Sequence, residues 1–425
     1  MLTPEGYKNR IVEKQLDEYL QTFGAVCIEG PKYCGKTWTG CSRSESVVYI
    51  GDPTNNFQNR TMANISPDLI LKGDAPRLID EWQEVPPIWD AVRFEVDKDN
   101  KKGKYILTGS ATPNHKGILH SGTARIGKVR MGTMSLFETG DSSGKVSLKD
   151  LFDENFTTQA TGEVSLKKLI YFVVRGGWPG NINTPEATCG NLAVEYLKAV
   201  VDDDMYKVDE VKRDSRKVWS LIRSLARNES TLVSNNTLRK DMGAMDEIMI
   251  DSNTVSDYLD VLNRLFLLDD QPAYSTKLRS SRRLLKSAKR HFIDPSLAVA
   301  ALSATPEMLY NDLNTFGFLF ENLCEHDLKI YAEYNGAKLF HFRDEKDNEA
   351  DAVVEFPDGT WGAFEIKLGA NQVDAAAKDL LKLKKIMENE GEKPPKILCI
   401  ICGMTNMAYR RDDGVYVVPI TSLCP

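Results

Sequence analysis

The stretch at residues 30–37 constrains this chain more than any other. It reads Gly-Pro-Lys-Tyr-Cys-Gly-Lys-Thr and matches the pattern G-x-x-x-x-G-K-[ST] in full. A short apolar run at 25–28 precedes it, and a proline-free stretch at 38–44 that can open a helix follows. Strand, glycine loop and helix form the context that this motif requires. The sequence therefore predicts a phosphate-binding loop on a parallel sheet.

The chemistry of this loop follows from its residue types. Glycines let backbone N–H groups surround phosphate oxygens, and the start of the next helix adds a favourable dipole. Lys36 is expected to reach the outer phosphates, and the Thr37 hydroxyl to ligate Mg²⁺. The alternative is a chance glycine-rich turn. The residues expected to contact the nucleotide are Gly30, Pro31, Lys32, Tyr33, Cys34, Gly35, Lys36, Thr37 and Trp38.

A second motif lies at residues 77–81, where a short apolar strand ends in two carboxylates. After a phosphate loop, Asp80 is expected to bind Mg²⁺ directly or through water, and Glu81 to polarise the attacking water. The alternative is a surface strand that happens to end in acids. The two motifs together favour the functional interpretation.

Polar and basic residues further along are candidates for the same site. A strand at 104–110 ends in Thr108 and Ser110, either of which can sense the γ-phosphate or position water, unless this is a plain strand-to-turn change. Arg125 or Arg130 can supply positive charge to a phosphate, within the chain or from a neighbouring subunit. Each arginine is equally well explained as a surface ion-pair partner.

The motifs then resemble a known family. The phosphate loop, Leu-Ile-Asp-Glu, Leu-Thr-Gly-Ser, Thr-Ala-Arg and Ser-Leu-Phe-Glu occur in that order. This resembles the AAA+-like ATPases of bacteria and archaea that carry a C-terminal domain of unknown function, and the resemblance covers essentially the whole chain. It implies an AAA+-type domain that binds ATP and Mg²⁺, with Thr108 or Ser110 at the sensor position. Lys32 stands where the family usually has Arg, and Ala124, where Gly is common, weakens Arg125 as an arginine finger.

The middle of the chain contains a predicted winged helix, which the family resemblance also implies. A capped amphipathic helix at 253–265 is followed by a strand, a basic stretch and a returning strand at 291–295. The functional interpretation is a wing that touches DNA phosphates, and the alternative is a solvated hairpin used for packing or partner contact. The basic residues are Lys277, Arg279, Arg282, Arg283, Lys286, Lys289 and Arg290.

The C-terminal part resembles the site of PD-(D/E)xK nucleases. Helical Glu321, then Asp351 on one strand of a hairpin, then Glu365-x-Lys367 on the next occur in the right order. The resemblance implies Asp351 and Glu365 as ligands of Mg²⁺ or Mn²⁺, Glu321 as an outer ligand, and Lys367 as the group that holds or activates water. An inactive binding module with the same fold is the alternative.

The composition sets limits on the class of protein. The net charge of −7 does not predict nucleic-acid binding without a local basic patch. The sequence has no apolar run long enough to span a bilayer and does not start like a signal peptide, so we expect a cytoplasmic protein with eight reduced cysteines. Cys399 and Cys402 have redox or zinc spacing but lie in an apolar run, which favours a buried strand.

Together these patterns predict an α/β chain with a P-loop parallel sheet covered by helices on both faces. The predicted parts are an AAA+-like nucleotide domain at 1–145, a helical connector at 146–225, a winged-helix-like domain at 226–300 and a nuclease-like α/β domain at 301–425. One hypothesis is a Mg²⁺-dependent ATPase that couples ATP and ADP states to DNA binding or cleavage. The other is a nucleotide-dependent switch or scaffold with an inactive nuclease-like domain. A homo-oligomer is a further candidate assembly under both.

Overall fold

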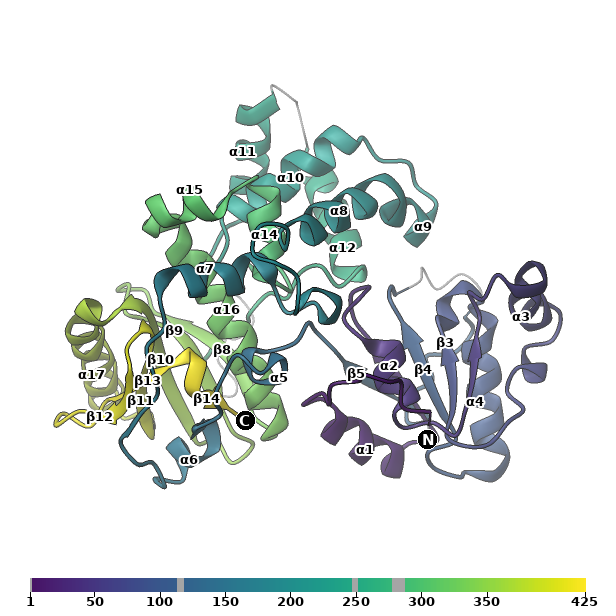
Figure 1. Cartoon of the computed structure of the whole chain (residues 1–425), viewed down its shortest axis with the longest axis horizontal. Helices are drawn as coiled ribbons and strands as arrows, with labels where there is room; N and C mark the ends of the chain where they lie inside the picture. The colour runs from purple at the N-terminus through teal and green to yellow at the C-terminus, as the bar shows by residue number, and fades with distance from the viewer. Residues whose placement is uncertain (1, 113–117, 247–250, 277–286) are drawn as a thin grey trace.

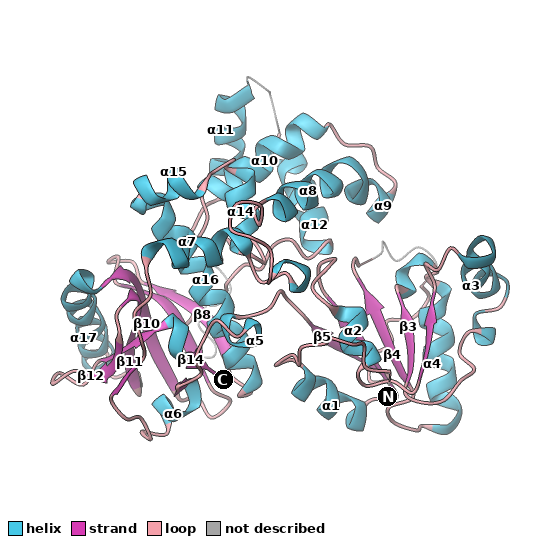
Figure 2. Ribbon diagram, in the orientation of Figure 1, coloured by secondary structure: helices cyan, strands magenta, loops and turns pink. Residues whose placement is uncertain are grey.

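The computed structural model describes residues 2–112, 118–246, 251–276 and 287–425. A sheet domain from the first part of the chain and a second sheet domain from its last part lie on opposite sides in Figure 1, with helices from the middle above them. Figure 2 shows helices against both sheets. The fold is thus α/β, as predicted, with a parallel P-loop sheet and a separate C-terminal mixed sheet. No helix within these ranges is long and apolar enough to cross a membrane.

The N-terminal sheet is five-stranded and parallel, in the order β2-β3-β4-β1-β5. Its strands read as continuous apolar runs because both faces are covered. Val26 and Ile28 of β1 pack toward α1 and α2, while Ala25 and Cys27 pack toward α3 and α4. The elements are α1 Glu13–Thr22, β1 Ala25–Glu29, α2 Lys36–Cys41, β2 Ser46–Tyr49, α3 Thr54–Ile65, β3 Arg77–Asp80, α4 Pro87–Asp99, β4 Tyr105–Gly109 and β5 Ile126–Arg130.

Helices of the middle region share one apolar core with the C-terminal domain. Trp178 is fully buried in that core, and its Nε1 donates to Ser296 Oγ at 3.0 Å. The helices are α5 Leu136–Thr139, α6 Leu148–Phe152, α7 Leu166–Arg175, α8 Asn191–Ala199, the π-helix Val200–Asp204, α9 Met205–Asp209, α10 Ser215–Arg227, α11 Asn235–Asp246, α12 Ser252–Arg264, α14 Pro295–Ala301 and α15 Pro306–Asn311.

Three antiparallel bridges tie a hairpin to the helices α10–α12. Thr231, between α10 and α11, pairs with Arg290, and after α12 Leu268 pairs with Phe292 and Gln271 with Lys289. The same hairpin reaches the C-terminal sheet, because the Tyr274 N–H donates to His341 O at 2.7 Å. The hairpin therefore joins the helical region to the last domain.

The C-terminal sheet is seven-stranded and mixed, in the order β7-β12-β13-β11-β10-β9-β8. The helix α16 packs on one face and α17 on the other. In chain order, a helix leads to three antiparallel strands, a crossover helix and a parallel strand. The elements are α16 Leu313–Tyr334, β8 Lys338–Arg343, β9 Glu349–Glu355, β10 Trp361–Gly369, α17 Val373–Asn389, β11 Ile397–Met404, β12 Met407–Arg410 and β13 Tyr416–Pro419.

The structure differs from the predicted connector at residues 146–160. The strand β6 (Val146–Ser147) pairs with β14 (Leu423–Cys424), and β7 (Gln159–Ala160) pairs with β12. This stretch packs with the C-terminal domain. Two-residue strands carry no alternation of their own, so the sequence shows no trace of these distant pairings. The other domain boundaries stay predictions.

Candidate functional site

A cleft of about 750 Å³ opens beside the phosphate loop. The loop with the start of α2, the N-terminal stretch 6–10 and the turn 179–183 from the middle region line most of it, and Glu81 and Met134 complete the lining. Its lining residues include Tyr7, Arg10, Lys32, Tyr33, Gly35, Lys36, Thr37, Trp38, Glu81, Pro179 and Asn183. The two motifs found in the sequence therefore share one cavity, and the turn adds a wall that the sequence did not predict.

The loop needs its glycines for steric reasons. Gly35 has φ 103°, in the left-handed region that favours glycine. A Cβ on Gly30 would lie 2.0 Å from the carbonyl oxygen of Met131. Lys36 is buried, and its Nζ donates to Pro31 O at 2.7 Å. The loop thus has a fixed curl with its lysine folded along the inner side.

The acidic motif lies beside the loop because β3 and β1 flank β4 in a parallel sheet, so the carboxyl ends of these strands meet at one edge. Asp80 Oδ1 accepts hydrogen bonds from Thr37 Oγ1 and Thr108 Oγ1, each at 2.7 Å. The Ser110 hydroxyl donates to Glu81 Oε2 at 2.9 Å. Thr108 and Ser110 were predicted as alternatives, and the structure gives each a contact with a different acid.

The electrostatics of this corner follow from burial. Burial raises the pKa of Asp80, against the hydrogen bonds from Thr108 and Thr37 that lower it. Thr37 and Asp80 present hydroxyl and carboxylate oxygens side by side, and Thr37 faces the cleft. Hard oxygen donors of this kind suit Mg²⁺. These two residues therefore fit the metal that the motif implies.

The predicted arginines lie away from the cleft. Arg125 comes just before β5, and its carbonyl accepts a hydrogen bond from the N–H of Ala25 at the start of β1. It therefore lies at the amino ends of the strands, whereas the phosphate loop follows the carboxyl end of β1. Its guanidinium pairs with Asp97 at 2.8 Å. Arg130 donates to Leu268 O at 2.9 Å. The expectation that Arg125 contacts the nucleotide within its own chain is wrong for this geometric reason.

A buried arginine that the sequence did not single out holds the loop in place. Arg10 Nη1 donates to Cys34 O at 2.6 Å, and its Nε pairs with Glu138 Oε1 at 2.9 Å. Its Nη2 donates to the carbonyls of Gly132 and Thr133. The spacing of Ser135 and Glu138 signals a helix N-terminus, and the capping box does form at α5. Glu138 also pairs with Arg10, and no local sequence pattern indicates this contact because the two residues are distant in the chain.

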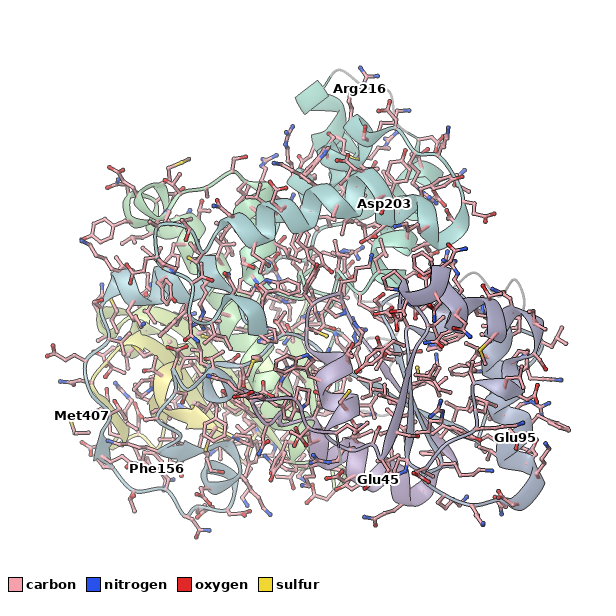
Figure 3. The ribbon with its side chains drawn as sticks, turned by 45° about the vertical axis from the view of Figure 1, so that its right-hand side comes forward. Glu45, Glu95, Phe156, Asp203, Arg216 and Met407 are labelled. Atoms are coloured by element: carbon pink, nitrogen blue, oxygen red, sulfur yellow. The ribbon has the colours of Figure 1, made fainter. Side chains whose placement is uncertain are left out.

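The middle region also contacts the phosphate loop. Lys32 forms an ion pair with Asp204, which closes the π-helix Val200–Asp204. In Figure 3 its neighbour Asp203 lies in the helical region above the nucleotide domain. The Gly177 carbonyl accepts from the N–H of Met134 at 2.7 Å. The glycine-rich turn at 175–180 thus packs between domains, and Pro179 and Gly180 also line the cleft.

The helix α16 contacts the segment that carries Glu138. The Asp327 carboxylate accepts from the N–H of Leu136 at 2.9 Å, and His326 Nε2 lies 3.1 Å from Thr133 Oγ1. The same helix carries Glu321 and Glu325 just before these two residues. The helix α16 therefore contacts the segment 133–138, which binds Arg10 beside the phosphate loop, and also carries residues of the second predicted site.

At that second site the structure brings Asp351, Glu365 and Lys367 into direct contact, and Glu321 lines a pocket together with Asp351. Lys367 Nζ lies 3.2 Å from Asp351 Oδ2 and 2.6 Å from Glu365 Oε2. Asp351 Oδ2 also accepts from the backbone N–H of Ile366 at 2.7 Å. Burial, followed by the charge of Asp351, raises the pKa of Glu365 to about 8. The lysine thus lies between the two predicted metal ligands.

Glu321 has a different partner from the one expected. It pairs with Lys289, which also lies 2.8 Å from Glu325 Oε1 and 3.3 Å from the backbone oxygen of Asp351. Burial alone would lower the pKa of Lys289, but the carboxylates of Glu325 and Glu321 raise it. Glu325 was not predicted, and it extends the cluster toward the hairpin.

A buried histidine continues the network. His291 Nδ1 lies 3.1 Å from Glu229 Oε1, and its Nε2 lies 3.0 Å from Glu325 Oε2. Burial would lower the pKa of His291, but Glu325 and Glu229 raise it to about 10. Ion pairs therefore connect residue 229, the hairpin and α16.

The side chains at this second site are not arranged as a set of ligands for the expected metal. Among the residues that the structure describes, no group of three or more His, Cys, Asp or Glu side chains is arranged to hold a metal ion. Asp351, Glu365 and Glu321 each have a lysine partner instead. In this arrangement the residues do not fit a divalent cation.

Part of the predicted basic wing lies outside the described residues, namely Lys277, Arg279, Arg282, Arg283 and Lys286. The sequence left DNA contact and packing open for this stretch, and the two described members pack against carboxylates. Lys289 is buried in the carboxylate cluster, and Arg290 pairs with Asp270. Their partners are distant in sequence, so a run of basic residues looked like one solvated patch.

The cysteines behave as predicted for a buried strand. Cys399 and Cys402 are buried in β11, and burial raises the pKa of Cys402 to about 11. All eight cysteines are free thiols. Thiols that stay protonated are poor redox or metal groups, which agrees with a packing role.

Three family models match successive parts of the chain. Residues 22–140 match the model of an AAA domain, 166–308 a domain of unknown function (DUF8612), and 316–423 a domain of unknown function (DUF4143). An uncharacterized protein of Mycobacterium tuberculosis is 22% identical over 368 residues, which cover 85% of this chain and 74% of the relative, and a Mycobacterium bovis protein matches equally.

Among solved structures, the Walker-type ATPase PABY2304 of Pyrococcus abyssi has a TM-score of 0.45 and 14% identity, covering 71% of this chain and 97% of that chain. A RuvB variant of Thermotoga maritima has a TM-score of 0.29 and 16% identity, covering 64% and 94%. The AAA match coincides with the parallel sheet and the phosphate loop. Residues 22–140 thus contain a P-loop ATPase domain of the AAA type.

Proposed function

We propose that this protein binds ATP and hydrolyses it with Mg²⁺. The observation that carries the proposal is the chain of contacts at the cleft, in which Thr37 and Thr108 both bind Asp80 and Ser110 binds Glu81. Phosphoryl transfer needs positioning and charge stabilisation more than covalent chemistry, and these contacts supply positioning.

Each residue then has a role. The loop N–H groups and Lys36 bind the phosphates, and Thr37 and Asp80 hold Mg²⁺, which neutralises charge on the phosphate oxygens. Glu81 orients the attacking water, and Ser110 fixes the carboxylate that does so. The base and sugar occupy the part of the cleft between the stretch 6–8 and the turn 179–183, which both line it. In this proposal Arg125 acts only across a subunit contact in a homo-oligomer.

Nucleotide binding tests this directly. Lys36→Ala should weaken ATP binding at least about 100-fold, because a buried ammonium beside the phosphates is lost. The matched control is Lys102→Ala, an exposed lysine of the same domain outside the cleft. Equal ATP affinity for Lys36→Ala and the control, measured by calorimetry, would overturn the proposal.

The C-terminal domain is proposed to be nuclease-like in fold. The order of helix, three antiparallel strands, crossover helix and parallel strand supports this, as does the placement of Asp351, Glu365 and Lys367 side by side. The first candidate function is cleavage of nucleic acid. The second is a module that binds without cutting, and the pairing of every predicted ligand with lysine favours it.

A cleavage assay separates these two functions. Single- and double-stranded DNA and RNA are incubated with the wild type and Glu365→Ala in Mg²⁺ or Mn²⁺. The second function predicts no cutting by either protein. Divalent-dependent cutting that Glu365→Ala abolishes would establish the first.

The helices α10–α12 with their three-bridge hairpin support a winged-helix proposal. In such domains the third helix commonly faces the partner. Here the exposed positions of α12 include Asp257 and Asp260. Because these carboxylates would repel DNA phosphates, contact with a protein partner through this helix is favoured over DNA reading.

A further inference from the structure

The carboxylate cluster of the C-terminal domain contains a lysine supplied by the hairpin of the middle region. Lys289 has only 9% of its side chain exposed. Its ammonium pairs with Glu321 and lies 2.8 Å from Glu325 and 3.3 Å from the backbone oxygen of Asp351. It therefore occupies the space between α16 and β9 where carboxylate and carbonyl oxygens converge.

The position of Lys289 is set by backbone pairing on both sides of the hairpin. Lys289 and Gln271 exchange backbone hydrogen bonds at 2.9 Å, and Gln271 Nε2 donates to Phe340 O in β8 at 2.9 Å. The Tyr274 N–H donates to His341 O next to it. The ammonium is thus delivered by an element attached to the edge of the C-terminal sheet.

The remaining carboxylates are compensated as well. Lys367 lies between Asp351 and Glu365 at 3.2 and 2.6 Å. A divalent cation would have to displace one of these ammonium groups and then share the space with the other. Buried charges are stable only when they are paired, so both lysines satisfy a need that a metal would otherwise meet.

We propose that Lys289 is the resident cation of the C-terminal carboxylate cluster, which is a socket for the hairpin and not a site for a divalent metal. This rests on the second candidate function of the C-terminal domain, binding without cutting, and gives a structural reason for it. The socket fixes the winged-helix-like region on the C-terminal domain, so the two act as one body.

Manganese binding tests the proposal on the full chain without nucleotide. Asp80→Asn removes the metal ligand of the nucleotide cleft, and free Mn²⁺ is followed by its electron paramagnetic resonance signal. The proposal predicts no stoichiometric Mn²⁺ site in this protein. One bound Mn²⁺ per chain that disappears when Asp351→Asn is added would overturn it. This measurement needs no change at Lys289, so a folding defect there cannot obscure it.

Thermal unfolding gives a second readout. Lys289→Met should lower the unfolding midpoint by about 5 °C or more, because it leaves the Glu321 carboxylate without its ammonium partner. Adding Glu321→Gln should recover part of the loss. Lys338→Met is the matched control, an exposed lysine at the start of β8. An unchanged midpoint for Lys289→Met would overturn the proposal. ATP binding by the same proteins tests the ATPase proposal separately.

Discussion

The position of Asp80 in the site was predictable from the sequence, but its contacts with other strands were not. Its place at the end of an apolar strand after a phosphate loop is a local pattern, so the sequence identified it. Its contact with Thr108 crosses from β3 to β4, and the sequence left Thr108 and Ser110 as alternatives. The structure shows that each residue supports a different carboxylate, since the Thr108 hydroxyl donates to Asp80 and the Ser110 hydroxyl donates to Glu81.

Thr108→Val should separate catalysis from binding. The change keeps the side-chain shape but removes a donor to Asp80 and the acceptor for the Glu81 N–H, which lies at 3.0 Å. We expect kcat to fall about 10- to 100-fold with ATP affinity within about threefold. Steady-state kinetics and calorimetry measure the two effects.

The control for this change is Thr161→Val. Thr161 has a buried hydroxyl oxygen without a hydrogen-bond partner among the described residues, so its removal should leave kcat unchanged. If Thr108→Val also left kcat unchanged, Thr108 would have no part in orienting the acids.

His291 makes stability depend on pH. Its pKa is raised to about 10 from an ordinary value of 6.5, with Glu325 and Glu229 facing it and Lys289 reaching the same Glu325. A raised pKa means that its stabilisation is complete below pH about 6.5 and is lost as the pH rises through about 10. Between these limits the free energy of unfolding should fall with pH, and less steeply in His291→Gln. Denaturant unfolding at several pH values measures this, and equal slopes would rule out the charged pair.

At the scale of elements, the strands and helices with regular patterns were predicted and the contacts between distant segments were not. The strands β1, β3 and β4 are apolar runs that end in polar motifs, so their place in the sheet followed from the motif. The turn 179–183 lines the cleft, and the hydrogen bond between residues 134 and 177 just before it joins segments that are distant in sequence. Lys289 was read as part of a basic wing because its partners lie on α16.

The ion pair between Arg10 and Glu138, which lies beside the phosphate loop, can be tested by a double-mutant cycle. Arg10 and Glu138 are almost fully buried, with side chains 4% and 2% exposed. Arg10→Met should lower the free energy of unfolding by about 3–5 kcal/mol, because it leaves a buried charge unpaired. Glu138→Gln added to it should cost less than the sum of the single changes. Additive losses in denaturant unfolding would mean that the pair is not coupled.

For the whole molecule, α16 is the element that connects the two predicted sites. Near its middle it presents Asp327 to the backbone of Leu136, and earlier it carries Glu321 and Glu325. The sequence predicted the helix and its Glu321, but only the fold shows that it touches the segment that binds Arg10. A change in the phosphate loop therefore has a continuous packed path to the C-terminal domain.

Of the two interpretations of the basic stretch outside the described residues, contact with DNA phosphates is tested by the salt dependence of DNA binding. Replacing Arg282, Arg283 and Lys286 by alanine should reduce the slope of log affinity against log salt by about 2–3. The matched control changes three exposed lysines of α17, Lys378, Lys382 and Lys385. Fluorescence anisotropy at several salt concentrations measures the slopes. An unchanged slope in the first variant would show that this stretch does not contact DNA.

The proposed activity of this protein is Mg²⁺-dependent hydrolysis of ATP. ATP turnover by the purified full chain, with and without DNA, compared with Glu81→Gln, tests it most directly. We predict turnover that requires Mg²⁺ and falls about 100-fold or more in Glu81→Gln while ATP binding is retained. Tight ATP binding with negligible turnover under every condition, or turnover unaffected by Glu81→Gln, would contradict the claim.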